Sequence, residues 1–201
     1  MLYFYMAKII TAKNVTKKEV ITQHAAVLFR QKGFAGTSMR ELAEKLGIEA
    51  SSLYNHIGSK SELLQTICFA VANDYNSQLE KTELSNEKVA VVIENIIRFH
   101  IHMMLHRFDE VFVANHEWKQ LQEPFLSNFL LQRKSYEAKL IALIKKGIQT
   151  KEFVNINPHV AVLTILSAVR GLEFWQRHKK NLEQKSLEQD IVYHLLNGLK
   201  K

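Results

Sequence analysis

Side chains between residues 50 and 60 have the hydrogen-bonding groups needed to contact DNA. Small and hydroxyl-bearing residues follow one another here, and the two apolar side chains, Leu53 and Ile57, are spaced four residues apart. Small residues let a helix approach base edges closely, while hydroxyl, imidazole and ammonium groups can donate hydrogen bonds to phosphate oxygens. The residues that we expect to contact DNA are Thr37, Ser38, Arg40, Ala50, Ser51, Ser52, Tyr54, Asn55, His56 and Lys60.

The flanking sequence predicts three short helices that would position these side chains. A capping box at Thr16 begins the first helix, which ends at Gly33. A second helix follows a hydroxyl cap at Ser38 and ends at Gly47, and a third covers residues 50–57 with Leu53 and Ile57 toward the core. A helix, a glycine turn and a second short polar helix form the helix-turn-helix pattern, which places its second helix in the major groove.

Residues 16–64 resemble the DNA-binding domain of the tetracycline-repressor (TetR) family. The resemblance covers about a quarter of the chain and departs from the family at two positions. Glu49 stands where the family usually has a serine-like cap, and Ile57 stands where it has phenylalanine. The matching residues are Ala25, Ala26, Leu28, Phe29, Gly33, Phe34, Thr37, Ser38, Met39, Leu42, Ala43, Gly47, Ile48, Leu53, Tyr54, His56 and Lys60.

Composition agrees with a cytoplasmic protein that has a polyanionic partner. The 201 residues carry a net charge of +7, and residues 1–63 hold nine Lys/Arg against five Asp/Glu. A weak excess of this kind also fits a merely solvated basic face. The single cysteine, Cys68, excludes an internal disulfide and is expected to be a buried, inert thiol. No stretch has the roughly eighteen unbroken apolar residues of a membrane span, so we expect no membrane association.

The rest of the chain predicts an all-α bundle behind the three short helices. Only two prolines occur, and no strand alternation is seen. Residues 1–15 are expected to be a flexible arm, 16–62 the helix-turn-helix domain, and 63–201 the ligand-binding and dimerisation domain. The expected helices of that last domain cover about 59–81, 86–106, 108–118, 124–150 and 158–178, followed by one capped at Ser186. The helix at 86–106 is apolar nearly all round, which predicts a central position.

The aromatic residues and methionines of this bundle have two interpretations. Most are expected to pack in the core, but apolar cavities with a few polar groups are also how helical bundles bind small molecules. TetR-like proteins usually bind an effector there and release DNA, so the resemblance implies a ligand site. The residues assigned to that site are Met103, Met104, Phe108, Phe112, His116, Phe125, Phe129, Tyr136, Arg170 and Phe174.

The resemblance also implies a homodimer, because the last two helices of the family form a four-helix interface. The alternative is that these helices complete the core of the monomer. Dimerisation is favoured because a helix-turn-helix gains affinity when two copies meet a two-fold operator. The expected interface residues are Leu163, Leu166, Val169, Phe174, Leu187, Ile191 and Leu195.

Metal binding and catalysis find little support in the sequence. His102 and His106 lie four residues apart and could share a metal, but no cysteine joins them, so ordinary histidines are favoured. No nucleophile elbow, phosphate loop or dinucleotide fingerprint occurs. We therefore expect no cofactor, no metal site and no enzymatic activity.

The favoured function is a DNA-binding transcriptional regulator, a repressor that a small hydrophobic ligand releases from a palindromic operator. Short strings between residues 99 and 199 resemble regulators of fatty-acid and sterol catabolism, which sense acyl-CoA thioesters; they include Arg133 with Tyr136, Asn157 with Pro158, and residues 171–175. The resemblance implies an acyl-CoA, a fatty acid or another hydrophobic effector. The alternatives are a helical metabolite-binding protein without a regulatory DNA role and a helical enzyme.

Overall fold

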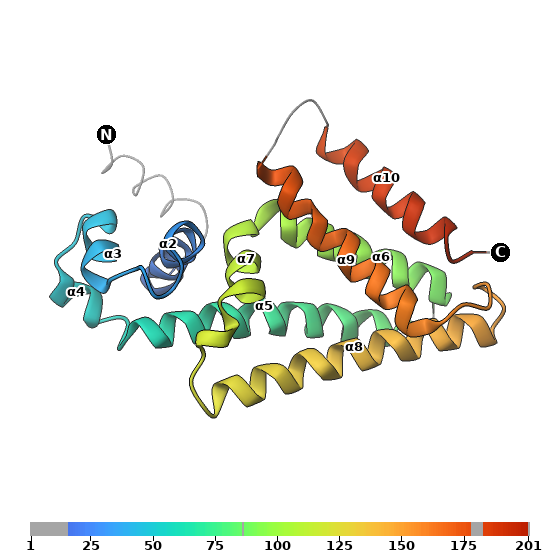
Figure 1. Ribbon diagram of the computed structural model, residues 1–201, viewed down its shortest axis with the longest axis horizontal. Helices are drawn as coiled ribbons and strands as arrows, with labels where there is room; N and C mark the ends of the chain where they lie inside the picture. Colours follow the sequence, from blue (N-terminus) through green and yellow to red (C-terminus); the bar gives the residue numbers. More distant parts are fainter. Residues whose placement is uncertain (1–15, 86, 178–182, 201) are drawn as a thin grey trace.

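The computed structural model describes residues 16–85, 87–177 and 183–200, so the expected arm of residues 1–15 lies outside it. Within these ranges the chain is all-α, as predicted, and no strand occurs (Figure 1). The helices are α2 (Lys17–Lys32), α3 (Met39–Leu46), α4 (Ala50–Tyr54), α5 (Lys60–Glu83), α6 (Val89–His106), α7 (Phe108–His116), the 3-10 turn η1 (Trp118–Gln120), α8 (Phe125–Gln149), α9 (Pro158–Arg177) and α10 (Gln184–Asn197).

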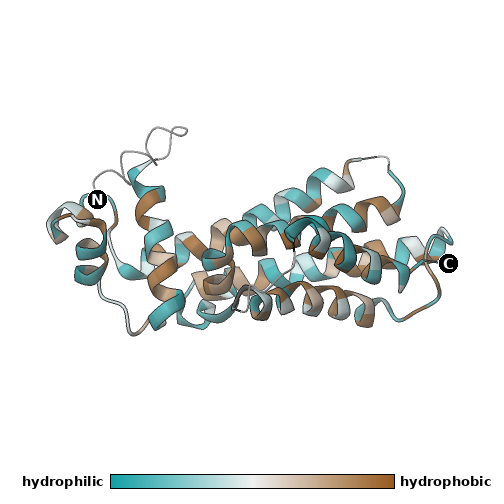
Figure 2. Cartoon of the chain, turned by 90° about the horizontal axis from the view of Figure 1, so that it is seen from above, coloured by the Kyte–Doolittle hydropathy of each residue, from teal (hydrophilic) through white to brown (hydrophobic). Residues whose placement is uncertain are grey.

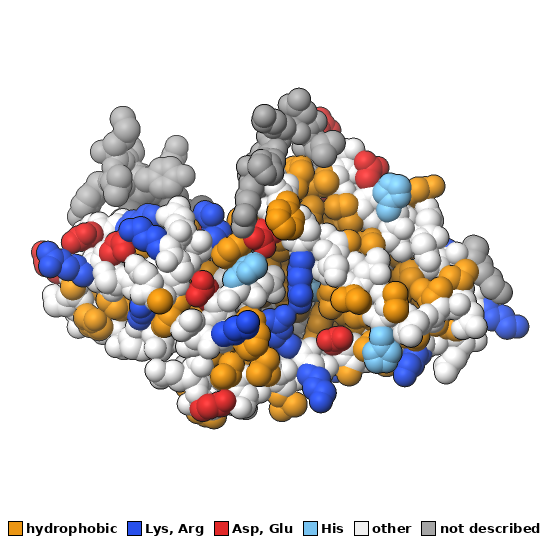
Figure 3. Space-filling model, in the orientation of Figure 1, with side chains coloured by type: hydrophobic (Ala, Val, Ile, Leu, Met, Phe, Trp, Pro, Cys, Tyr) orange, Lys and Arg blue, Asp and Glu red, His pale blue; other side chains and the backbone are white. Residues whose placement is uncertain are grey.

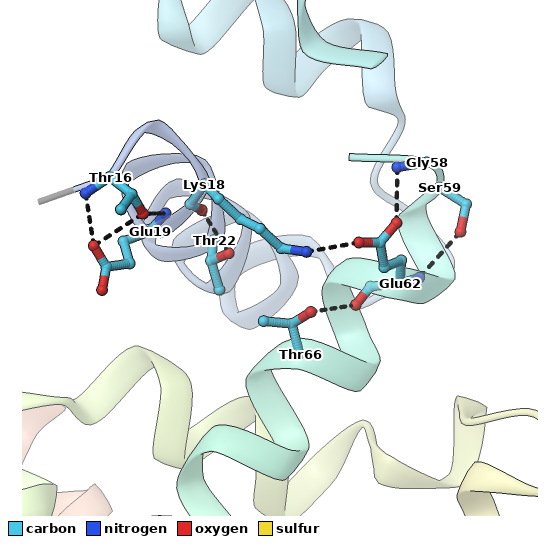
Figure 4. Close-up of polar contacts among 8 residues, drawn as sticks. All are labelled: Thr16, Lys18, Glu19, Thr22, Gly58, Ser59, Glu62 and Thr66. Carbon is cyan, nitrogen blue, oxygen red and sulfur yellow. Dashed lines mark hydrogen bonds and ion pairs between the residues drawn. The ribbon is translucent and has the colours of Figure 1, made fainter. Parts of the chain in front are cut away.

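The N-terminal unit, residues 16–62, is fixed by the caps that the sequence predicts. The Thr16 hydroxyl accepts from the Glu19 amide at 3.2 Å, and the Glu19 carboxylate accepts from the Thr16 amide at 2.7 Å (Figure 4). Glu62 accepts from the Gly58 amide and from the Lys18 ammonium, both at 2.8 Å. Because Lys18 is on α2 and Glu62 on α5, this carboxylate ties the first helix of the unit to the last.

The long helix α5 joins this unit to the C-terminal bundle, α5–α10. In Figure 1, α5 leaves α4 and runs through the molecule with α8 beside it, while α6, α9 and α10 lie on its other side. Helix α7 packs against both α2 and α5. The expected border between residues 62 and 63 therefore falls inside one continuous helix, and a shift of α5 would move α4 with it.

Helix α6 occupies the centre of the bundle, as its composition predicts. It packs against α5, α7, α8, α9 and α10, and side chains such as Ile93, Ile97 and Ile101 are fully buried. Figure 2 shows that the helices of the molecule carry both hydrophobic and hydrophilic residues. Among the described helices it alone is long and apolar enough to cross a membrane, and half of its residues are buried inside the protein. Packing at the bundle centre accounts for that composition.

Several helix boundaries differ by a few residues from the sequence predictions, and two of them concern predicted caps or site residues. Helix α4 ends at Tyr54 rather than near Ile57, although the Ile57 amide still donates to the Leu53 carbonyl at 3.1 Å. The last helix begins at Gln184, so the predicted cap at Ser186 is wrong. Ser186 already lies inside the first turn, where its hydroxyl contacts Asp190 at 3.4 Å. A hydroxyl followed by polar residues is compatible with the first helical turn as well as with a cap.

Candidate functional site

The predicted DNA-contacting surface of α4 is a polar face held on two buried anchors. Leu53 is 0% exposed and Ile57 is 1% exposed, so both lie in the core of the N-terminal unit. The side chains between and beside them point outward: Ser51, Ser52, Tyr54, Asn55 and His56 are all exposed. Ala50 is half-buried at the start of the helix. The chain thus presents hydroxyl, amide and imidazole groups together on one accessible surface.

Helix α3 adds an exposed basic side chain beside this surface. Ser38 caps the helix, because its hydroxyl accepts from the Glu41 amide at 3.1 Å. Arg40 is exposed, and its Nε lies 3.2 Å from the Glu44 carboxylate on the same helix. An ion pair this exposed contributes little to stability, which leaves the Arg40 guanidinium available to a phosphate.

Thr37 has a different role from the one predicted. Its side chain is 3% exposed and its hydroxyl donates to the Gly33 carbonyl at 3.0 Å. Its amide is also occupied, because it donates to the Phe34 carbonyl at 3.3 Å. The expected phosphate contact of Thr37 is therefore corrected: the residue holds the turn between α2 and α3.

Lys60 also turns inward. Its ammonium donates to the carbonyls of Phe34 and Thr37, both at 2.8 Å, and lies 4.4 Å from the centre of the Phe34 ring. Two of its three N–H donors are thus used inside the N-terminal unit. Lys60 therefore clamps the α2–α3 turn onto α5, and its phosphate contact stays a prediction.

A cavity of about 120 Å³ lies in the C-terminal bundle, between α5, α6, α7, α8 and α9. Four of the predicted ligand residues line it: Met104, Phe129, Tyr136 and Arg170. The sequence missed other lining residues, among them Tyr75, His100 and Arg133. A signal for Tyr75 existed, because its spacing on α5 places it on the buried stripe of that helix.

The other predicted ligand residues do not line the cavity. Met103 is buried on another side of α6, Phe125 and Phe174 are exposed, Phe108 packs under the Arg30 guanidinium, and Phe112 stacks on His116. His116 also contacts the Glu173 carboxylate at 2.9 Å. These residues lie outside the cavity because the helix faces that carry them do not point into it. Aromatic composition alone does not show which face of a helix points inward.

Three rings with polar groups lie together in the cavity wall. His100 Nε2 and the Tyr136 hydroxyl are 2.7 Å apart, and Tyr75 stacks on the His100 ring with centroids 4.2 Å apart. Burial lowers the pKa of His100 to about 3, and the nearby charge of Arg170 acts in the same direction. Burial raises the pKa of Tyr136. His100 and Tyr136 are therefore both neutral near pH 7, and each satisfies the other.

Arg133 differs from these rings, because one of its buried nitrogens has no hydrogen-bond partner. Its guanidinium lies over the rings of Trp118 and Phe129, 5.7 and 5.8 Å from their centres. Its Nη1 atom is buried and makes no hydrogen bond. Burial lowers the pKa of Arg133, and the neighbouring Arg170 lowers it further. Within the described ranges neither arginine forms an ion pair.

Helix α7 connects the cavity to the N-terminal unit. Val111, Ala114 and Asn115 of this helix line the cavity. In the first turn of the same helix, Asp109 pairs with Arg30 of α2, whose guanidinium also lies 5.6 Å from the Phe108 ring centre. A change in the position of α7 would therefore move or strain its contact with α2.

An exposed apolar surface runs along α9 and α10. Leu163 is 66% exposed, with Val160 and Phe174 also exposed on α9 and Tyr193 on α10. Figure 3 shows hydrophobic side chains at the surface in this part of the molecule. The expected interface needs correction at Val169, which is 2% exposed and lines the cavity. The remaining residues, Leu166, Leu187, Ile191 and Leu195, are half-buried against the protein's own core.

The cysteine is buried, whereas the two histidines of the predicted pair are exposed. Cys68 is fully buried, and burial raises its pKa to about 12, so the thiol is protonated. This confirms the predicted inert thiol. The rings of His102 and His106 are exposed and lie 4.4 Å apart. In the part of the chain that the structure describes, no group of three potential metal ligands forms around them.

Comparisons with known proteins agree with both halves of this architecture. Residues 21–67 match the family of bacterial regulatory proteins named tetR, and residues 87–199 match the tetracyclin repressor-like C-terminal domain. The negative transcriptional regulator IcaR of the biofilm operon icaADBC, from Staphylococcus aureus, is 26% identical over 192 residues, 90% of this chain and 97% of that protein.

Two solved structures have the same fold. The ketosteroid regulator KstR2 of Mycobacterium tuberculosis gives a TM-score of 0.86 at 18% identity, over 94% of this chain and 97% of that one. AibR, solved with isovaleryl coenzyme A and operator DNA, gives 0.77 at 22% identity, over 90% of this chain and 98% of that one. An exposed polar helix on a capped N-terminal unit, a cavity in the bundle behind it and a family match over each half lead to one conclusion: the chain belongs to the TetR family of transcriptional regulators.

Proposed function

We propose that this protein is a homodimeric, cytoplasmic repressor that reads a palindromic operator and releases it when a small hydrophobic effector enters the bundle cavity. The observation that carries the proposal is the polar face of α4, exposed over the fully buried Leu53. IcaR, which is similar over nearly its whole length, is a negative regulator by name and supports the repressor assignment.

The proposed division of labour follows the fold. Residues 16–62 bind DNA and residues 63–201 bind the effector and the second copy. Ser51 and Ser52 are small enough for close approach to base edges, whereas Tyr54 and Arg40 reach phosphate oxygens. Two such units meet successive major grooves only when two chains pair, and the apolar surface around Leu163 on α9 supports that pairing.

The proposed effector binds between α5 and α9. The apolar walls and the neutral His100–Tyr136 pair suit a hydrophobic ligand of limited size. AibR, a neighbour in fold, was solved with isovaleryl coenzyme A, so an acyl-CoA-like compound is one candidate class for this chain. The cavity volume of about 120 Å³ would take a short acyl group.

The proposed release of DNA runs through α7. A ligand that contacts Val111 or Ala114 pushes on the helix that carries Asp109, the partner of Arg30 on α2. A ligand shifts such an equilibrium only if it binds the DNA-released arrangement more tightly than the DNA-bound one. The effector must therefore prefer the position of α7 in which the two N-terminal units no longer match adjacent grooves.

The test measures binding of the purified protein to DNA flanking its own gene by fluorescence anisotropy across a salt series. Tyr54→Phe removes a hydroxyl that reaches phosphate, so we expect weaker binding to every sequence. Ser52→Ala should change the preference among operator variants instead. Ser135→Ala, an exposed serine on α8, is the matched control. If Tyr54→Phe and Ser52→Ala both behave as the control does, α4 is not the recognition helix.

A further inference from the structure

We propose that the bundle cavity binds the carboxylate of a small organic acid, with Arg133 as its anchor and Arg170 beside it. The inference rests on the proposed effector site and names the chemical group that the site selects. It narrows the choice from hydrophobic ligands in general to anions whose charge lies inside the cavity.

The first observation is the unused hydrogen-bonding capacity of Arg133. Its Nη1 is buried without a partner, although buried polar atoms in folded proteins are nearly always satisfied. The rings of Trp118 and Phe129 cover its guanidinium without accepting a conventional hydrogen bond. A carboxylate is the natural complement, because its two oxygens match the planar fork of guanidinium donors.

The second observation is the excess of positive charge. Arg133 and Arg170 both line the cavity, and the charge of Arg170 disfavours the charged form of Arg133 and of His100. Glu137 also lines the cavity, but it pairs with neither arginine. In Figure 3, Lys and Arg side chains gather on the surface between α7 and α9. The Glu137 carboxylate favours the charged form of Arg133, but less strongly than Arg170 disfavours it, so an anion in the cavity would offset the remaining repulsion.

The third observation separates Arg133 from the remaining polar groups of the wall. His100 and Tyr136 satisfy each other at 2.7 Å, so they do not require a charged ligand. Gln132 has a buried unpaired Oε1, which can accept from a water or from a hydroxyl of the ligand. Among the described residues of the wall, Arg133 is the one with a buried charged donor that makes no hydrogen bond, and it therefore decides the class of ligand.

Size and wall chemistry limit the rest of the acid. Val71, Phe129 and Val169 provide an apolar surface for the body of the ligand. An apolar cavity of about 150 Å³ holds one benzene molecule, so a cavity of about 120 Å³ suits a body of roughly four to six carbons. Longer chains would have to push α7 or α9 outward.

The experiment is calorimetric titration with the sodium salts of butyrate, hexanoate and decanoate, and with the primary amides of the same chains, at constant ionic strength. We expect butyrate or hexanoate to bind at least tenfold more tightly than its amide and more tightly than decanoate. Arg133→Gln should remove the preference for the acid and leave amide binding within threefold. Lys134→Gln, an exposed neighbour on α8, is the matched control and should keep the preference.

The outcomes separate this inference from the proposed function. Equal binding of acid and amide to the unaltered protein, or an acid preference that survives Arg133→Gln, would overturn the carboxylate site. If Arg133→Gln does not fold, Arg170→Gln takes its place and should weaken acid binding selectively. If the acids bind but do not displace DNA, the carboxylate site is supported and the proposed release of DNA by an effector is contradicted. If butyryl-CoA displaces DNA but the free acids do not bind, the proposed regulatory function is supported and the carboxylate site is contradicted.

Discussion

Replacing Lys60 with methionine separates a structural role from a role in DNA contact. The ammonium donates to the Phe34 and Thr37 carbonyls, each at 2.8 Å, and both carbonyls belong to the turn between α2 and α3. Methionine keeps most of the apolar stem, but it leaves both carbonyls without their charged donor. The substitution should therefore loosen this turn on α5 rather than remove a phosphate contact.

The size of the effect follows from the two bonds. A hydrogen bond to a charged group contributes about 1.5–3 kcal/mol, and water can replace part of it because Lys60 is only half-buried. We therefore expect a loss of about 2 kcal/mol in the free energy of unfolding of the N-terminal unit. For a chain of this length that corresponds to a fall of roughly 4–8 °C in Tm.

Calorimetry and a salt series on DNA binding together test this reasoning. Lys45→Met is the control, since Lys45 is exposed on α3 and makes no ion pair within the described part of the chain. We expect Lys60→Met to lower Tm while the salt dependence of DNA binding by the folded protein stays unchanged. Unchanged Tm, with a slope of log K against log salt reduced by about 0.9 per chain, would refute the structural role and restore the phosphate contact.

Three further predictions concern the bundle and its connection to the N-terminal unit. The pKa of His100 is lowered to about 3, so between that value and about 6.5 the unfolded chain binds a proton that the folded chain does not. Stability should therefore fall as pH drops from 7 to 5, and His100→Gln should flatten this dependence in thermal melts; parallel curves would contradict the burial of a neutral ring. Arg30→Gln should reduce the loss of DNA affinity that an effector causes, because it breaks the pair with Asp109; an unchanged effector response in anisotropy would exclude this path. Leu163→Lys should convert the dimer to monomer in light scattering and weaken operator binding at least tenfold, whereas a dimer that persists would place the interface elsewhere.

Local signals made the N-terminal unit predictable. The Thr16 and Ser38 caps and the glycines at the helix ends act within a few residues, and the structure bears out the helices that they delimit. Leu53 and Ile57 also follow from spacing alone, because a residue four positions away lies on the same helix face. The structural role of Lys60 was not predictable in this way, because its partners are carbonyls about 25 residues earlier in the chain.

The sequence predicted that the bundle has a ligand cavity, but not which residues line it. The sequence shows that aromatic residues and methionines are plentiful in the bundle, yet it does not fix how α5, α7 and α8 rotate against one another. Phe112 therefore stacks on His116 at the surface, while Tyr75 and His100 form the wall. Arg133 belongs to the strings that resemble acyl-CoA-sensing regulators, but only the packed helices show that its Nη1 is buried and makes no hydrogen bond.

Footprinting of the purified protein on the DNA that flanks its own gene tests the central claim most directly. We expect one protected segment with two related half-sites, whose centres lie one helical turn of about 10 base pairs, or a multiple of it, apart. We also expect Ser52→Ala to alter the protected sequence. Absence of any protected segment at protein concentrations that saturate non-specific binding would contradict the assignment of this chain as an operator-binding regulator.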